Sequence, residues 1–274
     1  MALNGGMDTH VKDYFRQFSE EHPTGTFHHV IPLHDGPDLN WSDVHRKVPT
    51  LPKGWYELSQ LPIADRIEML KSFWLMKMPF CPHFLERIDN FFQNIDDIGI
   101  YLYQAKFDDP YHAELVYSSK NNTGFFRGGV PATEDQLLSL QKLFADTILP
   151  EDYMAFLSIH NGFSKASDTG IIPVEKMNSK FKAFQDSFIS DTMLFTPSGE
   201  PVDPKTLIPF YESFGMPFYQ CFWTEWYPES EMGNVYYSGI TQTISSVKSA
   251  DPNSDSMAFY SFSSWLMFYL ENIT

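Results

Sequence analysis

Residues 149–162 read LPEDYMAFLSIHNG, a segment with clear signals for both ends of a short helix. Leu149 and Pro150 predict a corner, because proline presets the backbone angle of a first helical turn. The two acidic residues that follow lie where a helix N-terminus favours negative charge. One helical face carries four residues: Tyr153, Phe156, Leu157 and His160. Asn161 and Gly162 supply the left-handed conformations that commonly end a helix, so the pair is expected to stop this one.

The neighbouring segments predict further helices and strands. Thr133 is a good helix N-cap, and Gln136 completes a capping box before a face of leucines. Alternating apolar residues predict three strands, at residues 207–211, 218–223 and 235–238. The turn at 215–217 favours a hairpin between the first two. Ser261 caps a final helix whose apolar residues repeat at helical spacing as far as Ile273.

The rest of the chain divides into two further segments. Residues 1–54 carry a short helix and then, over 22–54, five prolines and three glycines, which predict an irregular arm. Residues 55–132 predict a pair of helices and a small β-meander, a candidate to extend the sheet of residues 133–274. Hairpin-linked strands with separate helices predict the α+β class, with a mostly antiparallel sheet flanked by helices.

Four short motifs follow one another in the second half of the chain. After the opening segment at 149–162 come LIPF at 207–210, GNVYY at 233–237 and SFSSWL at 261–266. In this order they resemble the SUKH superfamily, which includes fungal cell-wall-synthesis regulators and many bacterial toxin-immunity proteins. The resemblance covers roughly residues 133–273.

The resemblance implies a non-enzymatic α+β binding module. Members of the superfamily typically act by holding another protein, often a polymorphic toxin that they neutralise. Five motif residues then have structural roles: Leu149, Pro150, Tyr153, Asn161 and Gly162. The turn at 214–217 departs from the family pattern, because it lacks the usual acidic residue.

Composition and charge argue against several classes of protein. The 274 residues include 19 Lys and Arg against 35 Asp and Glu, a formal net charge of −16. Nucleic acids are not expected as partners, because affinity for them depends on cations that displace counterions. The chain shows neither a secretory leader nor an apolar run long enough for a membrane span, so we expect a cytoplasmic protein without membrane contact. The two cysteines lie far apart, which argues against a disulfide scaffold or a thiolate zinc site.

The histidines of the arm are the candidate metal ligands in this sequence. They are His22, His28, His29, His34 and His45. Their spacing matches no helix-borne zinc motif, and the chain lacks the common hydrolase, phosphate-loop and dinucleotide motifs. We therefore expect no metal, no cofactor and no catalytic residues.

Residues 206–247 contain no Lys or Arg but are rich in Glu and aromatic residues. Such a surface attracts a basic partner, and Trp and Tyr commonly anchor protein interfaces. Alternate strand residues face inward, so part of the aromatic set is expected in the core. The predicted binding residues are Trp223, Glu225, Trp226, Tyr227, Glu229 and Glu231. Among them, Trp226 and Tyr227 are expected to reach solvent.

Three hypotheses about function follow. The first is a protein-binding module, foremost an immunity protein that holds a basic toxin through this acidic aromatic face. The second is a regulatory or scaffold protein of the same fold that contacts its partner through the arm at 22–54. The third is a metal-dependent hydrolase that uses the histidine-rich arm. The sequence leaves the oligomeric state open.

Overall fold

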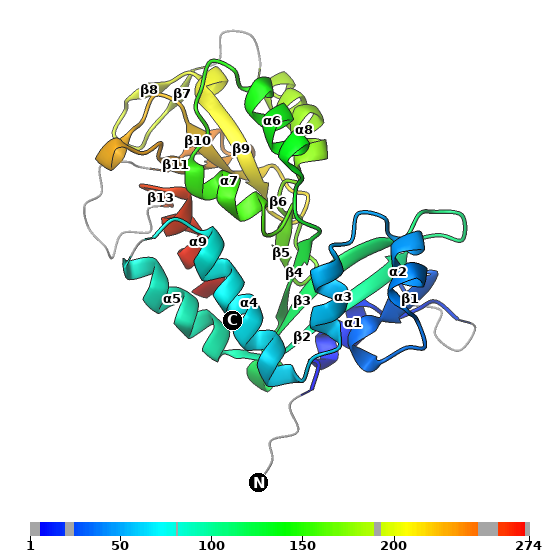
Figure 1. Cartoon of the computed structure of the whole chain (residues 1–274). Coiled ribbons are helices and arrows are strands. Elements are labelled where there is room, and N and C mark those ends of the chain that lie inside the picture. Colours follow the sequence, from blue (N-terminus) through cyan, green and yellow to red (C-terminus); the bar gives the residue numbers. More distant parts are fainter. Residues whose placement is uncertain (1–5, 20–24, 81, 189–192, 246–256, 272–274) are drawn as a thin grey trace. The chain divides into compact units, whose positions relative to one another are not determined.

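The computed structural model describes residues 6–19, 25–80, 82–188, 193–245 and 257–271 (Figure 1). Contacts divide these residues into two units. The N-terminal unit contains the described residues up to 131 together with 163–167 and 271, and the C-terminal unit contains those of 132–162 and 168–270. Each unit combines helices with an antiparallel sheet, which confirms the predicted α+β class.

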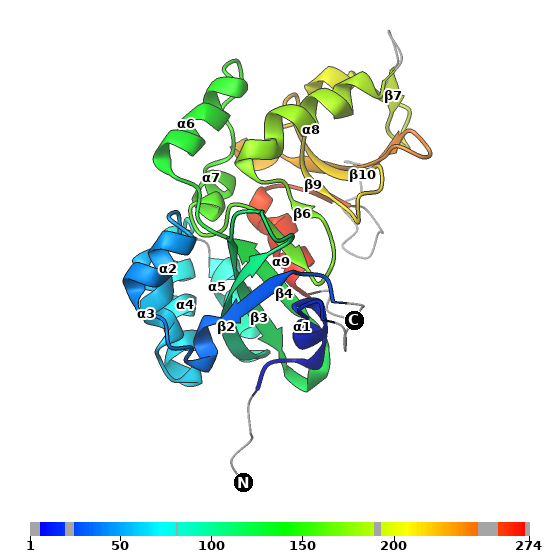
Figure 2. The same cartoon turned by 90° about the vertical axis from the view of Figure 1, so that its right-hand side faces the viewer.

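The sheet of the N-terminal unit has the strand order β1-β2-β3-β4-β5, and adjacent strands are antiparallel. Its strands are β1 (His29–Pro32), β2 (Ile95–Gln104), β3 (His112–Ser119), β4 (Phe125–Gly129) and β5 (Phe163–Lys165). In β3, Val116 and Tyr117 point to opposite faces of the sheet, as the pleat requires. Val116 packs in a cluster with Val11 of α1 (Thr9–Tyr14), whereas the Tyr117 ring contacts Trp74 on the other face. Figure 2 shows α1 in front of these strands.

The predicted helical pair is present as α4 (Ile63–Lys77) and α5 (Pro82–Gln93). Trp74 of α4 and Phe91 of α5 stack with ring centroids 5.8 Å apart, and both rings contact Tyr117 of the sheet. The meander that follows the pair is β2, β3 and β4. The helical periodicity of this segment therefore predicted the pair of helices.

The prediction of an irregular arm was wrong for much of residues 28–54. This segment contains β1, the 3₁₀ turn η1 (Leu33–Asp35), α2 (Trp41–Lys47) and α3 (Lys53–Ser59). Its prolines lie at element boundaries, where they are tolerated: Pro32 ends β1 and Pro52 precedes α3. Leu33 and Val44 are 1% and 0% exposed, so this segment is part of the hydrophobic core.

The sheet of the C-terminal unit has the order β6-β9-β10-β11-β12, and β13 also pairs with β11. Its strands are β6 (Gly170–Ile171), β9 (Leu207–Glu212), β10 (Phe218–Trp223), β11 (Asn234–Ser238), β12 (Thr243–Ile244) and β13 (Ala258–Phe259). A separate pair contains β7 (Leu194–Phe195) and β8 (Pro201–Val202). The three strands expected in this region are confirmed as β9, β10 and β11. Strands β7, β8, β12 and β13 were missed, because a pair of residues carries no periodicity.

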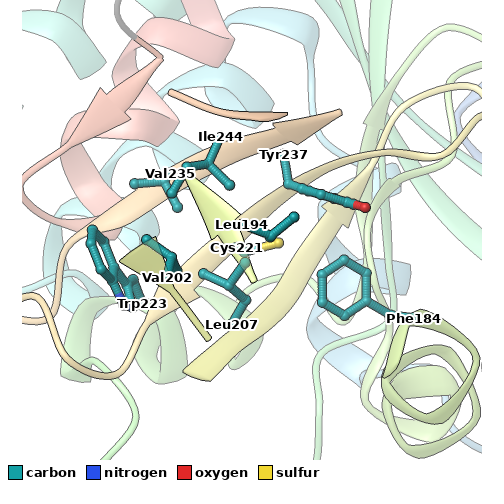
Figure 3. Packing of buried hydrophobic residues seen from close by; sticks show 9 residues of the cluster. All are labelled: Phe184, Leu194, Val202, Leu207, Cys221, Trp223, Val235, Tyr237 and Ile244. Carbon is teal, nitrogen blue, oxygen red and sulfur yellow. The ribbon is translucent and has the colours of Figure 1, made fainter. Parts of the chain in front are cut away.

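Both faces of β10 are buried. Figure 3 shows Cys221 and Trp223 in a cluster with Phe184, which belongs to α8 (Val174–Asp186). Phe222 points the other way and stacks on Phe210 at 4.3 Å. The rings of α7 (Glu151–Leu157) and α9 (Phe262–Glu271) cover that second face, with Tyr153 5.1 Å from Phe222. The C-terminal sheet therefore lies between α8 and the pair α7 and α9.

The segment at 149–162 folds as predicted at its start and differently at its end. Pro150 is the N-cap of α7, and Leu149 and Tyr153 are 3% and 1% exposed. The prediction that Asn161 and Gly162 stop this helix was wrong, because α7 ends at Leu157 and closes with a 3₁₀-type bond before the pair is reached.

Asn161 and Gly162 instead contribute to the next elements. The Asn161 side chain accepts the Val174 N–H at 2.7 Å and donates to Glu175 at 2.8 Å, so it satisfies groups at the start of α8. Gly162 has a φ of +93°, the conformation that favours glycine. Upstream, the predicted capping box of Thr133 and Gln136 is confirmed at the start of α6 (Glu134–Leu143).

Candidate functional site

The connection between β10 and β11 carries most of the residues predicted to bind a partner. We call residues 224–231 the acidic aromatic loop. The Trp223 N–H donates to the Gly233 carbonyl at 3.0 Å, and the Gly233 N–H donates to the Trp226 carbonyl at 2.9 Å. Pro228–Ser230 forms a 3₁₀ turn inside the loop. Backbone hydrogen bonds therefore define the loop at its base and within its length.

Trp223 does not belong to the surface of this loop. Its side chain is 8% exposed and packs in the core cluster that includes Leu207 and Val235 (Figure 3). The alternation of β10 directs Trp223 to the same face as Cys221. Trp223 is therefore removed from the predicted binding residues, because a buried side chain cannot contact a partner.

Trp226 is half-buried and held by contacts on several sides. Its ring centroid lies 6.2 Å from that of Trp223 and 6.2 Å from that of Tyr260. The ring also lies against the backbone of Gly233, where a Cβ would stand 2.3 Å from Cε3. Only a residue without a side chain fits beneath the indole, so these contacts determine where the loop presents its neighbouring residues.

The exposed residues of the loop combine negative charge with an aromatic ring. Tyr227 is 52% exposed, and Glu225 and Glu231 are exposed on either side of it in the sequence. The side chain of Glu229 lies outside the side chains that the structure describes. Tyr260, 46% exposed, joins the group through Trp226 and was missed, because no local pattern connects it to a loop so far away in sequence.

Glu212 lies in the same cation-free segment but does not contribute to this surface. It is 4% exposed, and its carboxylate pairs with the Lys180 ammonium of α8 at 2.5 Å. Of the described acidic side chains in this segment, Glu225 and Glu231 are exposed on the loop.

A buried carboxylate supports the turn between β9 and β10. Asp168 is 2% exposed and accepts the hydroxyl of Tyr211 at 2.7 Å, the hydroxyl of Tyr269 at 3.1 Å and the Phe214 N–H at 2.7 Å. The turn at 214–217 lacks an acidic residue, and here a carboxylate from another segment binds its backbone. This role was not predicted, because it depends on residues more than forty positions apart.

Other titratable groups of the C-terminal unit also have structural contacts. Cys221 is buried in the core cluster, and burial raises the pKa of its thiol well above the ordinary value. Burial likewise raises the pKa of Asp152, whose carboxylate accepts the Ser263 N–H at 2.7 Å and so connects α7 to α9. The raised pKa of the Cys221 thiol is the opposite of what an activated nucleophile requires, because activation lowers the pKa of a thiol.

The histidines of the predicted arm occupy separate contacts. His29 contacts Tyr111, the His45 ring stacks on Trp41, and His34 bonds to the backbone of Ile100. Within the described residues, no three His, Cys, Asp or Glu side chains converge as a metal site, and His22 lies outside those residues. The described part of the chain also has no helix with the length and apolar character to cross a membrane.

The segment of the chain that matches a known protein family nearly coincides with the C-terminal unit. Residues 131–268 match the family model described as SMI1 / KNR4 family (SUKH-1). A search among curated proteins found no match to the chain. The matched segment contains all four motifs, at 149–162, 207–210, 233–237 and 261–266, which confirms the resemblance seen in the sequence. Because the match covers half of the chain and nearly all of its C-terminal unit, this chain belongs to the SMI1 / KNR4 family (SUKH-1).

Proposed function

We propose that this chain is a non-catalytic protein-binding module whose acidic aromatic loop holds a basic protein partner. The observation that carries the proposal is the exposure of Tyr227, Glu225 and Glu231 on a loop that Trp226 anchors. Carboxylates attract a basic partner over a distance, and an exposed tyrosine supplies contact area with little entropy to lose.

The anchored loop reduces the cost of binding. Association loses free energy to the ordering of flexible segments, so a loop already held by backbone bonds and a packed indole loses less. The bonds between Trp223, Trp226 and Gly233 supply that order before a partner arrives. Tyr227 then projects from a fixed base.

Within this class, we propose immunity against a basic toxin as the specific role. Family membership supports a module that acts by binding, and the net charge of −16 suits a cationic partner. The alternative of a regulator that binds through residues 22–54 has less support, because Leu33 and Val44 of that segment are committed to the core.

A comparison of matched variants tests the surface. The immobilised full-length chain is used to capture proteins from native lysate, next to the triple variant Glu225→Lys, Tyr227→Ala and Glu231→Lys. We expect the unchanged chain to retain a basic protein and the loop variant to retain about tenfold less of it. Equal capture by both would remove the acidic aromatic loop from the proposal.

A second triple variant controls for the change in charge. Glu68→Lys, Phe107→Ala and Asp146→Lys alter exposed residues elsewhere and change the net charge equally. This variant is expected to capture the partner as the unchanged chain does. If this control variant failed to capture the partner while its thermal unfolding curve was unchanged, binding would depend on the overall charge and not on the loop.

A further inference from the structure

A cavity of about 640 Å³ lies within the N-terminal unit, outside the segment matched by the family model. Its walls come from α1 and its flanks, β1, η1, the start of α4 and β2. Pockets for small molecules typically have volumes of about 300–1,000 Å³ and combine apolar walls with a few placed polar groups. This cavity has both features.

A buried ion pair forms part of the wall. Arg66 of α4 and Asp97 of β2 are each 4% exposed, and Nη2 of the arginine lies 2.8 Å from Oδ1 of the carboxylate. Nε of Arg66 is buried and finds no hydrogen-bond partner among the residues that the structure describes. A buried donor without an acceptor costs free energy, which a ligand with an acceptor group would recover.

His34 adds a second donor. Nδ1 of this ring lies 3.2 Å from the Ile100 nitrogen and 3.4 Å from the Ile100 carbonyl oxygen, and a neutral ring that accepts the Ile100 N–H carries its proton on Nε2. Nε2 lies 3.8 Å from the Asp35 carboxylate, which is too far for a hydrogen bond. Gly99 makes room for the ring, since a Cβ there would stand 2.6 Å from Cε1 of His34.

The remaining lining divides into charges and apolar walls. Lys12 and Asp35 are exposed and add one positive and one negative charge to those of Arg66 and Asp97. The apolar lining includes Phe15, Val30 and Ile63. The cavity is therefore balanced in charge, with cations and anions beside an apolar wall.

We propose that this cavity binds a free α-amino acid with an apolar side chain. Its carboxylate would accept from Arg66 and His34, its ammonium would lie near Asp35 and Asp97, and its side chain would pack on the apolar wall. A simple carboxylate leaves the exposed Asp35 without a cation, and a simple amine leaves Nε of Arg66 without an acceptor. This site is independent of the acidic aromatic loop.

Calorimetric titration of the full-length chain tests the chemistry of the ligand. L-leucine and L-phenylalanine are the probes, with 4-methylpentanoate and isoamylamine as partners that lack one charged group. We expect saturable binding of at least one amino acid and affinities about tenfold weaker for the acid and the amine. No saturation by either amino acid, or equal binding of the carboxylate, would overturn the proposal.

Variants test the place of binding. Ile63→Trp fills the cavity from the first residue of α4, and Lys12→Glu reverses a charge on exposed lining. Both are expected to weaken amino-acid binding about tenfold. Lys182→Glu, exposed on α8 in the other unit, is the matched control and is expected to bind normally. Unchanged affinity in Ile63→Trp, with folding verified by circular dichroism, would place the ligand elsewhere and refute this site.

Discussion

The indole ring of Trp226 covers the backbone of Gly233 so closely that a Cβ on residue 233 would stand 2.3 Å from its Cε3 atom. Gly233→Ala must therefore displace the ring. We expect the substitution to lower the free energy of unfolding by about 1–3 kcal/mol, as overpacking does. Urea denaturation followed by tryptophan fluorescence measures this loss.

Gly54→Ala is the control for a glycine with free space. No atom lies within 4 Å of a Cβ built at Gly54, which is part of α3. Alanine is the better helix former, so this variant is expected to be equal to the parent or more stable by up to about 1 kcal/mol. If both glycine variants behaved alike, the close packing of Trp226 would not be the cause.

Asp168→Asn tests the buried carboxylate that supports the β9–β10 turn. An amide of the same shape replaces one acceptor oxygen with a donor, which then faces a hydroxyl or N–H that also donates. We expect a loss of about 2–3 kcal/mol in urea denaturation. Tyr211→Phe removes a single bond to the same carboxylate and is expected to cost about 1 kcal/mol. A fully stable Asp168→Asn variant would contradict this account.

Removing one charge of the Arg66–Asp97 pair is expected to lower the free energy of unfolding more than removing both charges. Asp97→Asn leaves a buried guanidinium without its counter-charge and should cost about 3–5 kcal/mol. The double variant Arg66→Met and Asp97→Leu buries no charge and should lie much closer to the parent in stability. Chemical denaturation of all three chains decides the matter. A double variant as unstable as Asp97→Asn would contradict this account.

His34 should make the protein less stable in acid. Burial, the largest effect, lowers the pKa of His34 below 6.5 despite the nearby carboxylates of Asp35 and Asp97. When the pKa of a group is lower in the folded than in the unfolded protein, the group stabilises the fold fully above its unfolded-state pKa. This stability is lost as the pH falls through the folded-state pKa.

The free energy of unfolding is thus expected to fall below about pH 6.5, with a slope of at most about 1.4 kcal/mol per pH unit from this group. Unfolding of the parent and of His34→Gln, compared between about pH 7 and about pH 5, measures the effect. The variant should lose less stability over that interval. Parallel pH profiles would exclude His34 as the source.

Much of the secondary structure could be predicted, because it depends on local chemistry. The apolar period of residues 62–79 and 84–95 corresponds to α4 and α5, and the capping box at Thr133 starts α6 where expected. Ser261 accepts the Ser264 N–H at 3.1 Å and starts α9. Each of these signals requires only residues within a few positions of one another.

The acidic aromatic surface could be predicted only in part. Strand alternation distinguishes two faces of β10, but both faces are buried, so the pattern could not tell that Trp223 points into the core. Asn161 likewise carried a local signal for a helix end, whereas its side chain binds the start of α8. In both cases a distant element determined the role of the residue.

The amino-acid order therefore settled the α+β class, the periodic helices and the family of the C-terminal segment, since these follow from neighbouring residues. The inward place of Trp223, the anchoring of Trp226 by Gly233 and Tyr260, and the cavity around Arg66 depended on the folded chain. Hydrophobic periodicity reports which face of an element is apolar, but not which distant element will cover it.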